Sequence, residues 1–144
     1  MDGLILEYKS LFNGCVKDID MKNRVVTGYL ADFDSKDHDG DISLKGAFKK
    51  SISERKNDIF FLNQHDWKQP HGKFKVLEED SKGLYFESEK LIDTTFSMDA
   101  LKMYEAGIVK EHSFGYQVVK QEFSKSDDAN IIREYKLYEG SNVT

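Results

Sequence analysis

Short segments rich in apolar and aromatic residues, each ending at a turn signal, recur along this chain and constrain its fold most strongly. The segments GKFKVLEED and GLYFESEKL flank the turn residues 80–83 and predict a β-hairpin. Further strands are expected within 4–12, 15–20, 24–33, 58–66, 110–118 and 131–139. We therefore expect an α+β fold, a mostly antiparallel β-barrel of about seven strands with two or more helices packed outside, with a β-sandwich as the alternative.

Two segments have the periodicity of helices instead. Leu44, Phe48 and Ile52 lie four residues apart and predict a helix through KGAFKKSISERK. A second helix is expected over 94–107, ending at a glycine cap. We expect its buried stripe to consist of Phe96, Ala100, Met103 and Gly107.

Composition and charge narrow the class of protein. The chain has 144 residues, of which 39% are hydrophobic, so we expect one domain, residues 1–144, with a truncated or processed C-terminus. The net charge of −5, with both signs interspersed, gives no basic stripe for nucleic acid. One cysteine, Cys15, cannot form an internal disulfide and is expected to be a small buried residue. No signal peptide or apolar run of ~20 residues is present, which predicts a soluble cytosolic protein without a membrane partner.

A histidine stands directly beside a serine in the strand-like segment KEHSFGYQ. In an extended chain, Ser113 shares a face with Glu111 and Gly115, whereas His112 points to the other face with Phe114. If Ser113 is a nucleophile, its base must therefore come from elsewhere. Gly115 is expected to leave the serine face of the strand open.

His65 is the histidine best placed to serve as that base. It follows an apolar run and lies in the polar turn NQHDW, where it can stay wet and neutral near pH 7. From the residues alone, an ordinary surface histidine and an ordinary strand serine at Ser113 are open alternatives. A Ser-His hydrolase is one hypothesis among several.

Metal sites are not expected. The acidic loop 34–41 resembles a calcium loop, but the position of the final bidentate glutamate is taken by Gly46. His65 and His71 lack partners at zinc-like spacing. We therefore predict no metal and no other cofactor.

Five motifs follow one another in order: VVTGYLADFDSKDHDGDISLKGAFKKSI, NQHDWKQPHGKF, SKGLYFESEKL, YEAGIVKEHSFGYQV and LYEGS. Together they resemble the prohead (capsid-maturation) serine proteases of tailed bacteriophages, which are distantly related to the herpesvirus assemblins. Each motif alone is weak, but their order over ~140 residues, the size of one domain, is specific.

The resemblance implies that Ser113 is the nucleophile and His65 the general base. An acidic third residue late in the chain, which would orient the imidazole, corresponds to Glu139. Assemblins use a second histidine there, so His71 and His38 are alternatives. Asp66 is adjacent to the base and would need an awkward turn to reach its ring.

Backbone N–H groups of Ser113 and Phe114 are candidates for stabilising an oxyanion. By resemblance, the substrates are the phage scaffold, the scaffolding arm of the major capsid protein and the protease itself. The site of action is the immature prohead in the bacterial host cytoplasm, and a homodimer is considered because assemblins act as dimers.

Two other functions are open at this point. One is a catalytically inactive barrel that binds capsid or scaffold, in which Ser113 and His65 are surface polar residues. The other is an esterase-like hydrolase of small molecules, which the missing G-x-S-x-G elbow disfavours.

Overall fold

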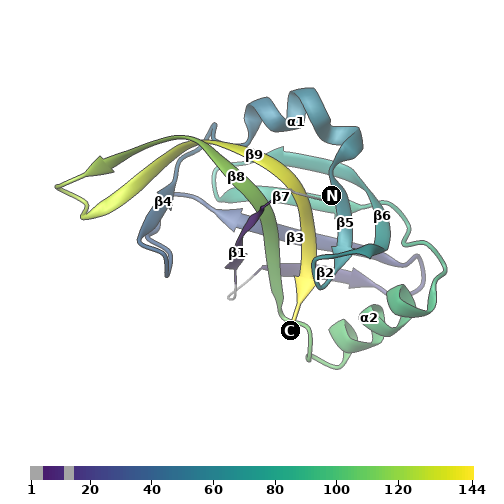
Figure 1. Cartoon of the computed structure of the whole chain (residues 1–144). Helices are drawn as coiled ribbons and strands as arrows, with labels where there is room; N and C mark the ends of the chain where they lie inside the picture. Colours follow the sequence, from purple (N-terminus) through teal and green to yellow (C-terminus); the bar gives the residue numbers. More distant parts are fainter. Residues whose placement is uncertain (1–4, 12–14) are drawn as a thin grey trace.

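The structure is a computed structural model that describes residues 5–11 and 15–144. Within them it contains nine strands, two α-helices and a short 3₁₀ helix (Figure 1). The strands are β1 (Glu7–Leu11), β2 (Val16–Asp20), β3 (Val25–Asp32), β4 (Asp41–Ser43), β5 (Phe60–Asn63), β6 (Asp66–Glu79), β7 (Gly83–Ser88), β8 (Glu111–Ser124) and β9 (Ala129–Val143). The helices are α1 (Lys49–Arg55), η1 (Lys56–Asp58) and α2 (Thr95–Glu105).

The strands form one curled sheet in the order β1-β8-β9-β5-β6-β7-β3-β2, with β4 beside β9. Its pairs are antiparallel except β4–β9 and β5–β9, which are parallel. The curl brings β8 against β3, where Nδ1 of His112 lies 3.0 Å from the carbonyl oxygen of Tyr29. The result is a half-open barrel with helices outside, which confirms the expected fold class, with nine described strands instead of about seven.

Figure 1 shows how the remaining parts surround this barrel. α1 packs beside β9 and β6, and α2 packs beside β6, β2 and β5 at the opposite end. The far halves of β8 and β9 run on as a long hairpin that projects from the sheet. Neither helix in the described ranges has the length and apolar character needed to cross a bilayer.

The core inside the curl is rich in aromatic side chains. Phe48 stacks on Tyr135 with 4.7 Å between ring centroids. Phe61, Phe74 and Phe86 pack together with centroids 5.3 to 5.6 Å apart. Burying a phenylalanine side chain stabilises a fold by about 1.5–3 kcal/mol. Because these rings come from β5, β6, β7, β9 and the start of α1, they hold the strands that carry the site.

The second predicted helix is present, but its buried stripe is different. The buried side chains of α2 are Ser97, Ala100, Leu101 and Tyr104. Met103, expected inside, is 42% exposed. The buried face instead contains the large apolar side chains of Leu101 and Tyr104, and the hydroxyl of Ser97, which lies on it, hydrogen-bonds to His71. The glycine cap is confirmed, since Gly107 follows the helix end with φ of +72°.

The structure can also be compared with the predictions made for residues 4–15. The strand expected within 4–12 corresponds to β1, which begins at Glu7 and ends at Leu11. The turn expected at Asn13–Gly14 lies outside the described residues. Cys15 is buried as expected, and its Sγ donates to the carbonyl oxygen of Lys110 at 2.8 Å.

Candidate active site

Ser113 lies in β8 between two neighbouring strands. It is paired with Ser10 on β1 and with Ser141 on β9. Its side chain is fully buried, and its Oγ has no hydrogen-bond partner in the part of the chain that the structure describes. Leaving a buried hydroxyl unpaired costs about 1–3 kcal/mol, so such a group calls for an explanation beyond packing. Ser113 is therefore a candidate for a chemical role.

His65 lies in the tight turn between β5 and β6, as expected. Both Gln64 and His65 have left-handed backbone angles, with φ of 56° and 59°, which cost about 1–2 kcal/mol each in residues with a side chain. The turn is held against β9, because the N–H of Gln64 donates to the carbonyl oxygen of Asn142 at 2.9 Å. The parallel pairing of Asn63 with Asn142 brings the turn to this point of β9.

The imidazole of His65 meets a buried carboxylate. Nδ1 of His65 lies 2.5 Å from Oε2 of Glu139, which is fully buried on β9, whereas the His65 side chain is 20% exposed. A carboxylate oxygen accepts, so Nδ1 is the donor in this contact and Nε2 is the ring nitrogen left to accept a proton. The ring therefore has the tautomer that a general base needs.

Ser141 links the backbone of the histidine to the carboxylate. Its Oγ donates to Oε1 of Glu139 at 2.7 Å and accepts from the backbone N–H of His65 at 3.2 Å. Glu139 and Ser141 share a face of β9 because they are two residues apart. In the sequence this serine belongs to the LYEGS motif, but no role was predicted for it. The Glu-x-Ser spacing could have indicated that the two side chains share a face of a strand.

Gly115 makes room for the carboxylate. A Cβ atom at Gly115 would lie 2.9 Å from Oε2 of Glu139 and 3.2 Å from the ring of Tyr8. That ring also packs on the imidazole of His65, with 4.2 Å between centroids. Partial burial and then the charge of Glu139 raise the pKa of Tyr8. The space that Gly115 was expected to leave open is thus filled by the Glu139 carboxylate and the Tyr8 ring.

His71 makes its hydrogen bonds elsewhere. Its Nε2 lies 2.6 Å from Oδ1 of Asn142, and its Nδ1 lies 2.7 Å from Oγ of Ser97. Asn142 Nδ2 donates onward to Oδ1 of Asn63 at 2.8 Å. Burial lowers the pKa of His71, against an opposing contribution from the bond with Asn142. The neutral ring braces β6, α2 and β9 behind the histidine turn.

His112 points to the face opposite Ser113, as the alternation predicted, and is fully buried there. Its Nδ1 donates to the carbonyl oxygen of Tyr29, and its Nε2 lies 2.7 Å from the hydroxyl of Tyr104. Burial lowers its pKa to about 4, although interactions with backbone carbonyls partly oppose the shift. His112 is therefore a neutral structural residue on the far face from Ser113.

The other candidates for orienting His65 also lie apart from its ring. Asp66 Oδ1 accepts from the backbone N–H of Lys68 at 2.9 Å. His38 is exposed in the loop between β3 and β4. Of the residues considered from the sequence, Glu139 is the one that the structure brings to the imidazole.

The two candidate oxyanion donors lie inside the strand ladder. β8 is paired on both sides from His112 to Tyr116. In antiparallel sheets, the N–H groups of successive residues point to opposite neighbours. The N–H of Ser113 and that of Phe114 therefore point in opposite directions, one toward β1 and the other toward β9.

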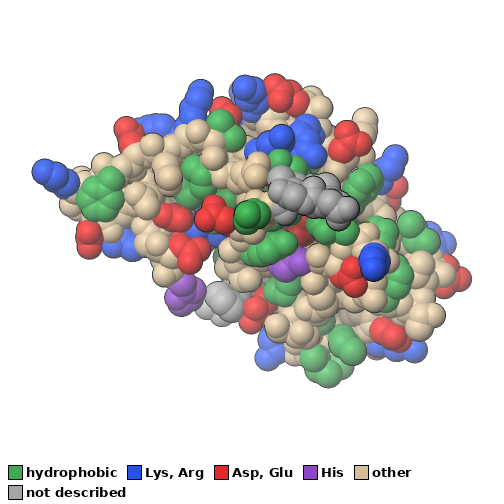
Figure 2. Space-filling view, viewed as in Figure 1, with side chains coloured by type: hydrophobic (Ala, Val, Ile, Leu, Met, Phe, Trp, Pro, Cys, Tyr) green, Lys and Arg blue, Asp and Glu red, His purple; other side chains and the backbone are tan. Residues whose placement is uncertain are grey.

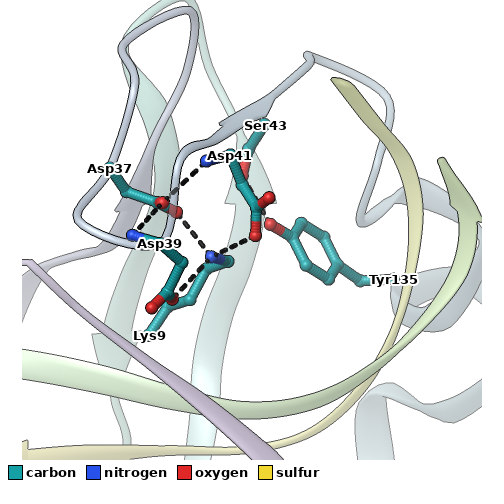
Figure 3. Close-up of polar contacts among 6 residues, drawn as sticks. All are labelled: Lys9, Asp37, Asp39, Asp41, Ser43 and Tyr135. Atoms are coloured by element: carbon teal, nitrogen blue, oxygen red, sulfur yellow. Dashed lines mark hydrogen bonds and ion pairs between the residues drawn. The ribbon is translucent and has the colours of Figure 1, made fainter. Parts of the chain in front are cut away.

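β1 is held to a nearby loop by one buried lysine (Figure 3). We call the ion pairs of this lysine with three aspartates the Lys9 clip. Nζ of Lys9 lies 2.5 Å from a carboxylate oxygen of Asp37, 3.0 Å from one of Asp39 and 2.8 Å from one of Asp41. Burial alone would lower the pKa of Lys9, but the three carboxylates outweigh it and hold the pKa above its usual value. The acidic loop that resembled a calcium loop thus surrounds an ammonium group from the chain itself.

Charge over the rest of the surface is mixed. Lysine and arginine side chains alternate with aspartate and glutamate on the face shown in Figure 2. Among the described residues, this face has no single-signed stripe of the kind that tracks a phosphate backbone.

Comparison with known proteins matches this chain to the family described as caudovirus prohead serine protease over residues 15–144. The chain is 33% identical over 106 residues to the prohead protease of Enterobacteria phage HK97, covering 73% of this chain and 47% of that protein. It is 30% identical over 135 residues to the prohead protease of Escherichia phage T5, covering 90% of this chain and 63% of that protein. The chain thus spans about half to two thirds of the length of these curated relatives.

The fold is also similar to a solved structure, that of the bacteriophage T4 capsid assembly protease. The TM-score is 0.68 at 11% sequence identity, over 96% of this chain and 99% of the other. This likeness supports the half-open barrel as the fold of the chain, and the family match covers β2 to β9 with both helices. The chain therefore belongs to the caudovirus prohead serine protease family.

Proposed function

We propose that this chain is a serine endopeptidase of capsid maturation, with Ser113 as nucleophile, His65 as general base and Glu139 as the residue that orients the base. The observation that carries the proposal is the 2.5 Å contact between Nδ1 of His65 and the buried carboxylate of Glu139. A buried carboxylate on the far nitrogen of an imidazole recurs in serine hydrolases of unrelated folds. Membership of a serine protease family supports the same roles.

The chemistry is acyl transfer. Nε2 of His65 takes the proton of the Ser113 hydroxyl as Oγ attacks the peptide carbonyl carbon. The imidazolium, stabilised by Glu139, then gives this proton to the leaving amine as the C–N bond breaks. A water activated by His65 hydrolyses the acyl-enzyme, and Ser113 recovers its proton. These steps require no metal or organic cofactor.

One backbone N–H group would stabilise the oxyanion. Ser113 and Phe114 are the candidates, and their N–H groups point to opposite neighbours of β8. Since β9 carries Glu139, we propose that the donor is whichever of the two faces the β1 side. Removing one side-chain donor from the oxyanion hole of a well-studied serine protease lowers the rate by about 10²–10³.

The names of the relatives suggest the setting. They are prohead proteases of phages HK97 and T5 and a capsid assembly protease of phage T4. We propose that this chain cleaves the phage scaffold, the scaffolding arm of the major capsid protein and itself. It would act inside the immature prohead in the bacterial host cytoplasm, and self-association into a homodimer would promote activity.

The test is the intact mass of the 144-residue chain after incubation with a reactive fluorophosphonate, with and without sulfate to favour association. We expect one adduct on the parent chain, none on Ser113→Ala and much less on His65→Ala. Ser10→Ala is the matched control, because Ser10 is the exposed serine paired with Ser113 across the strand. It should keep the adduct.

The rival functions give different results. A barrel that only binds capsid or scaffold has no activated serine, so no variant and no condition would give an adduct. A small-molecule esterase would give the adduct and hydrolyse small esters, but would leave scaffold and capsid polypeptides intact. Cleavage of a polypeptide that is lost in Ser113→Ala contradicts both.

A further inference from the structure

Ser113 is fully buried, so a substrate carbonyl can reach its Oγ only after a neighbouring element has moved. β8 has two neighbours at this point. β9 carries Glu139 and Ser141, and its departure would dismantle the site. β1 carries none of the proposed catalytic residues and lies at the end of the sheet order. Of the two sheet neighbours, β1 is therefore the one that can leave without dismantling the proposed site.

Mainly polar interactions keep β1 paired with β8. It is paired with β8 over only five residues, Glu7 to Leu11. Lys9 is the one buried residue of this strand, and Ser10 is exposed. What keeps the strand in place is the backbone ladder, the Lys9 clip and the ring contact of Tyr8 with His65. Segments with few buried apolar contacts open at low free energy.

The vacated edge would suit an extended peptide. Without β1, β8 presents a row of unpaired backbone N–H and C=O groups beside Ser113, including one of the two candidate oxyanion donors. Such an edge takes up a further strand by main-chain pairing. A polypeptide segment in extended form therefore fits where β1 lies.

The acidic cluster of Asp37, Asp39 and Asp41 adds a side-chain preference. Its ligand oxygens lie within 4.8 Å of one another, and three carboxylates surround a single ammonium. Lys9 is paired with Phe114, one position along from Ser113. A strand in the same register would bring its own side chain to this cluster. The occupant that the cluster favours is a cation, as Lys9 itself demonstrates.

We infer that the β1 edge of β8 is the substrate-binding site, where an extended polypeptide segment replaces β1 and Asp37, Asp39 and Asp41 accept a lysine or arginine side chain from it. This inference rests on the proposed function and names its substrate class. β1 is then the occupant that the chain supplies to its own site. The hollow beside it, of about 170 Å³ and lined by Tyr8, Lys9, Ser10, Asp37, His38 and Asp39, borders the position of the basic side chain.

The test measures binding of a fluorescein-labelled synthetic peptide, ILEYKSL, which copies residues 5–11. Fluorescence anisotropy compares the full chain with its Lys9→Met variant, in which the clip is cut and the edge is easier to vacate. We expect the variant to bind the peptide about tenfold more tightly, which corresponds to about 1.4 kcal/mol. A second peptide with methionine in place of its lysine should bind about tenfold more weakly than the first.

Lys120→Met is the matched control, because Lys120 pairs with Glu134 at 3.6 Å on the projecting hairpin and should bind like the parent. Tyr8→Ala is a second opening variant that keeps the clip, in case Lys9→Met does not fold, and we expect about threefold tighter binding from it. Equal binding by parent and opened variants, or by the two peptides, would overturn the inference.

The binding assay does not depend on the proposed chemistry, because it can be repeated on Ser113→Ala. An adduct at Ser113 together with unchanged peptide binding would sustain the proposed function and reject the binding site. Lysine-dependent peptide binding without any adduct would sustain the binding site and reject the protease.

Discussion

The two neighbours of β8 differ in almost every respect. β9 is paired with β8 along the full length from Glu111 to Ser124 and is itself mostly buried. β1 is paired over five residues and has one buried residue, Lys9. Ser113 thus lies between a long strand fixed in the core and a short strand held by a polar clip. In the proposed function, the β9 side would stay fixed and hold the chemistry, and the β1 side would exchange to admit the substrate.

β9 can bring the proposed catalytic residues together because it pairs in parallel with β5. β9 is antiparallel to β8 but parallel to β5, whose end leads into the His65 turn. One strand therefore positions the strand of the proposed nucleophile, the turn of the proposed base and the carboxylate of Glu139. Changes to β9 polar residues should cost more activity than equivalent changes on β1.

The largest effect is expected from Glu139→Gln. The amide cannot stabilise the imidazolium and can hold the wrong tautomer of His65, so the rate of fluorophosphonate labelling should fall by about 10²- to 10⁴-fold. Glu134→Gln, on the same strand but far along the hairpin, is the control and should keep the parent rate. A Glu139→Gln chain that labels as fast as the parent would remove Glu139 from the mechanism.

The second effect concerns the core face of β8 and appears as a pH dependence of stability. The pKa of His112 is about 4 in the folded chain, below the usual value of 6.5, because burial disfavours the charged ring. Between these values the unfolded chain binds more protons, so the free energy of unfolding should fall as pH drops from 6.5 toward 4 and stay level above. The loss is on the order of 3 kcal/mol at most. The lowered pKa of His71 acts in the same direction.

Urea unfolding at pH values from 4 to 7.5 measures this slope. His112→Gln cannot be protonated at this position, so its unfolding free energy should depend less on pH than that of the parent. A parent chain equally stable at pH 4.5 and pH 7 would contradict a buried neutral His112.

The activities of Ser141→Ala and Ser10→Ala test the difference between β9 and β1 directly. The two serines pair with Ser113 from opposite sides. Removing the Ser141 hydroxyl leaves Oε1 of Glu139 and the N–H of His65 without their partner. We expect kcat to fall about tenfold with KM little changed, since an unsatisfied buried group costs about 1–3 kcal/mol. Ser10→Ala should change kcat less than about twofold. Equal effects from both serines would refute the division into a fixed and an exchangeable side.

The smallest effect is expected within the clip. The side chain of Asp39 is 62% exposed and that of Asp41 only 14%. Exposed ion pairs contribute less than about 1 kcal/mol, so Asp39→Asn should barely speed amide hydrogen exchange in residues 7–11. Asp41→Asn should speed it clearly, while exchange in β9 stays unchanged in both. Faster exchange in β9 would show that the two strands open together.

Features that depend on residues close together in the sequence could be predicted, and features that depend on distant residues could not. The hairpin around 80–83, the alternation at Ser113 and the Gly107 cap follow from neighbours in sequence, and the structure has all three. The inward position of Ser97 on α2, where its hydroxyl bonds to His71 on β6, was missed. Periodicity of apolar residues cannot detect a buried hydroxyl with a distant partner.

The candidate site shows the same limit. His65 and Ser113 were singled out from local patterns, but only the resemblance to a family pointed to Glu139. Nothing local indicates that β5 and β9 pair in parallel, and that pairing brings His65 to Glu139. The Lys9 clip was missed for the same reason, because its partners come from a loop about 30 residues away.

The contact between His65 and Glu139 joins residues 74 positions apart in the sequence. Such a contact carries a large loop-closure entropy, and parallel pairings between distant strands are among the slow steps of folding. Until β9 pairs with β5, His65 has no contact with the carboxylate of Glu139. The proposed protease would therefore become competent only when β9 docks, which ties the onset of hydrolysis to the completion of folding and spares polypeptides that the nascent chain meets earlier.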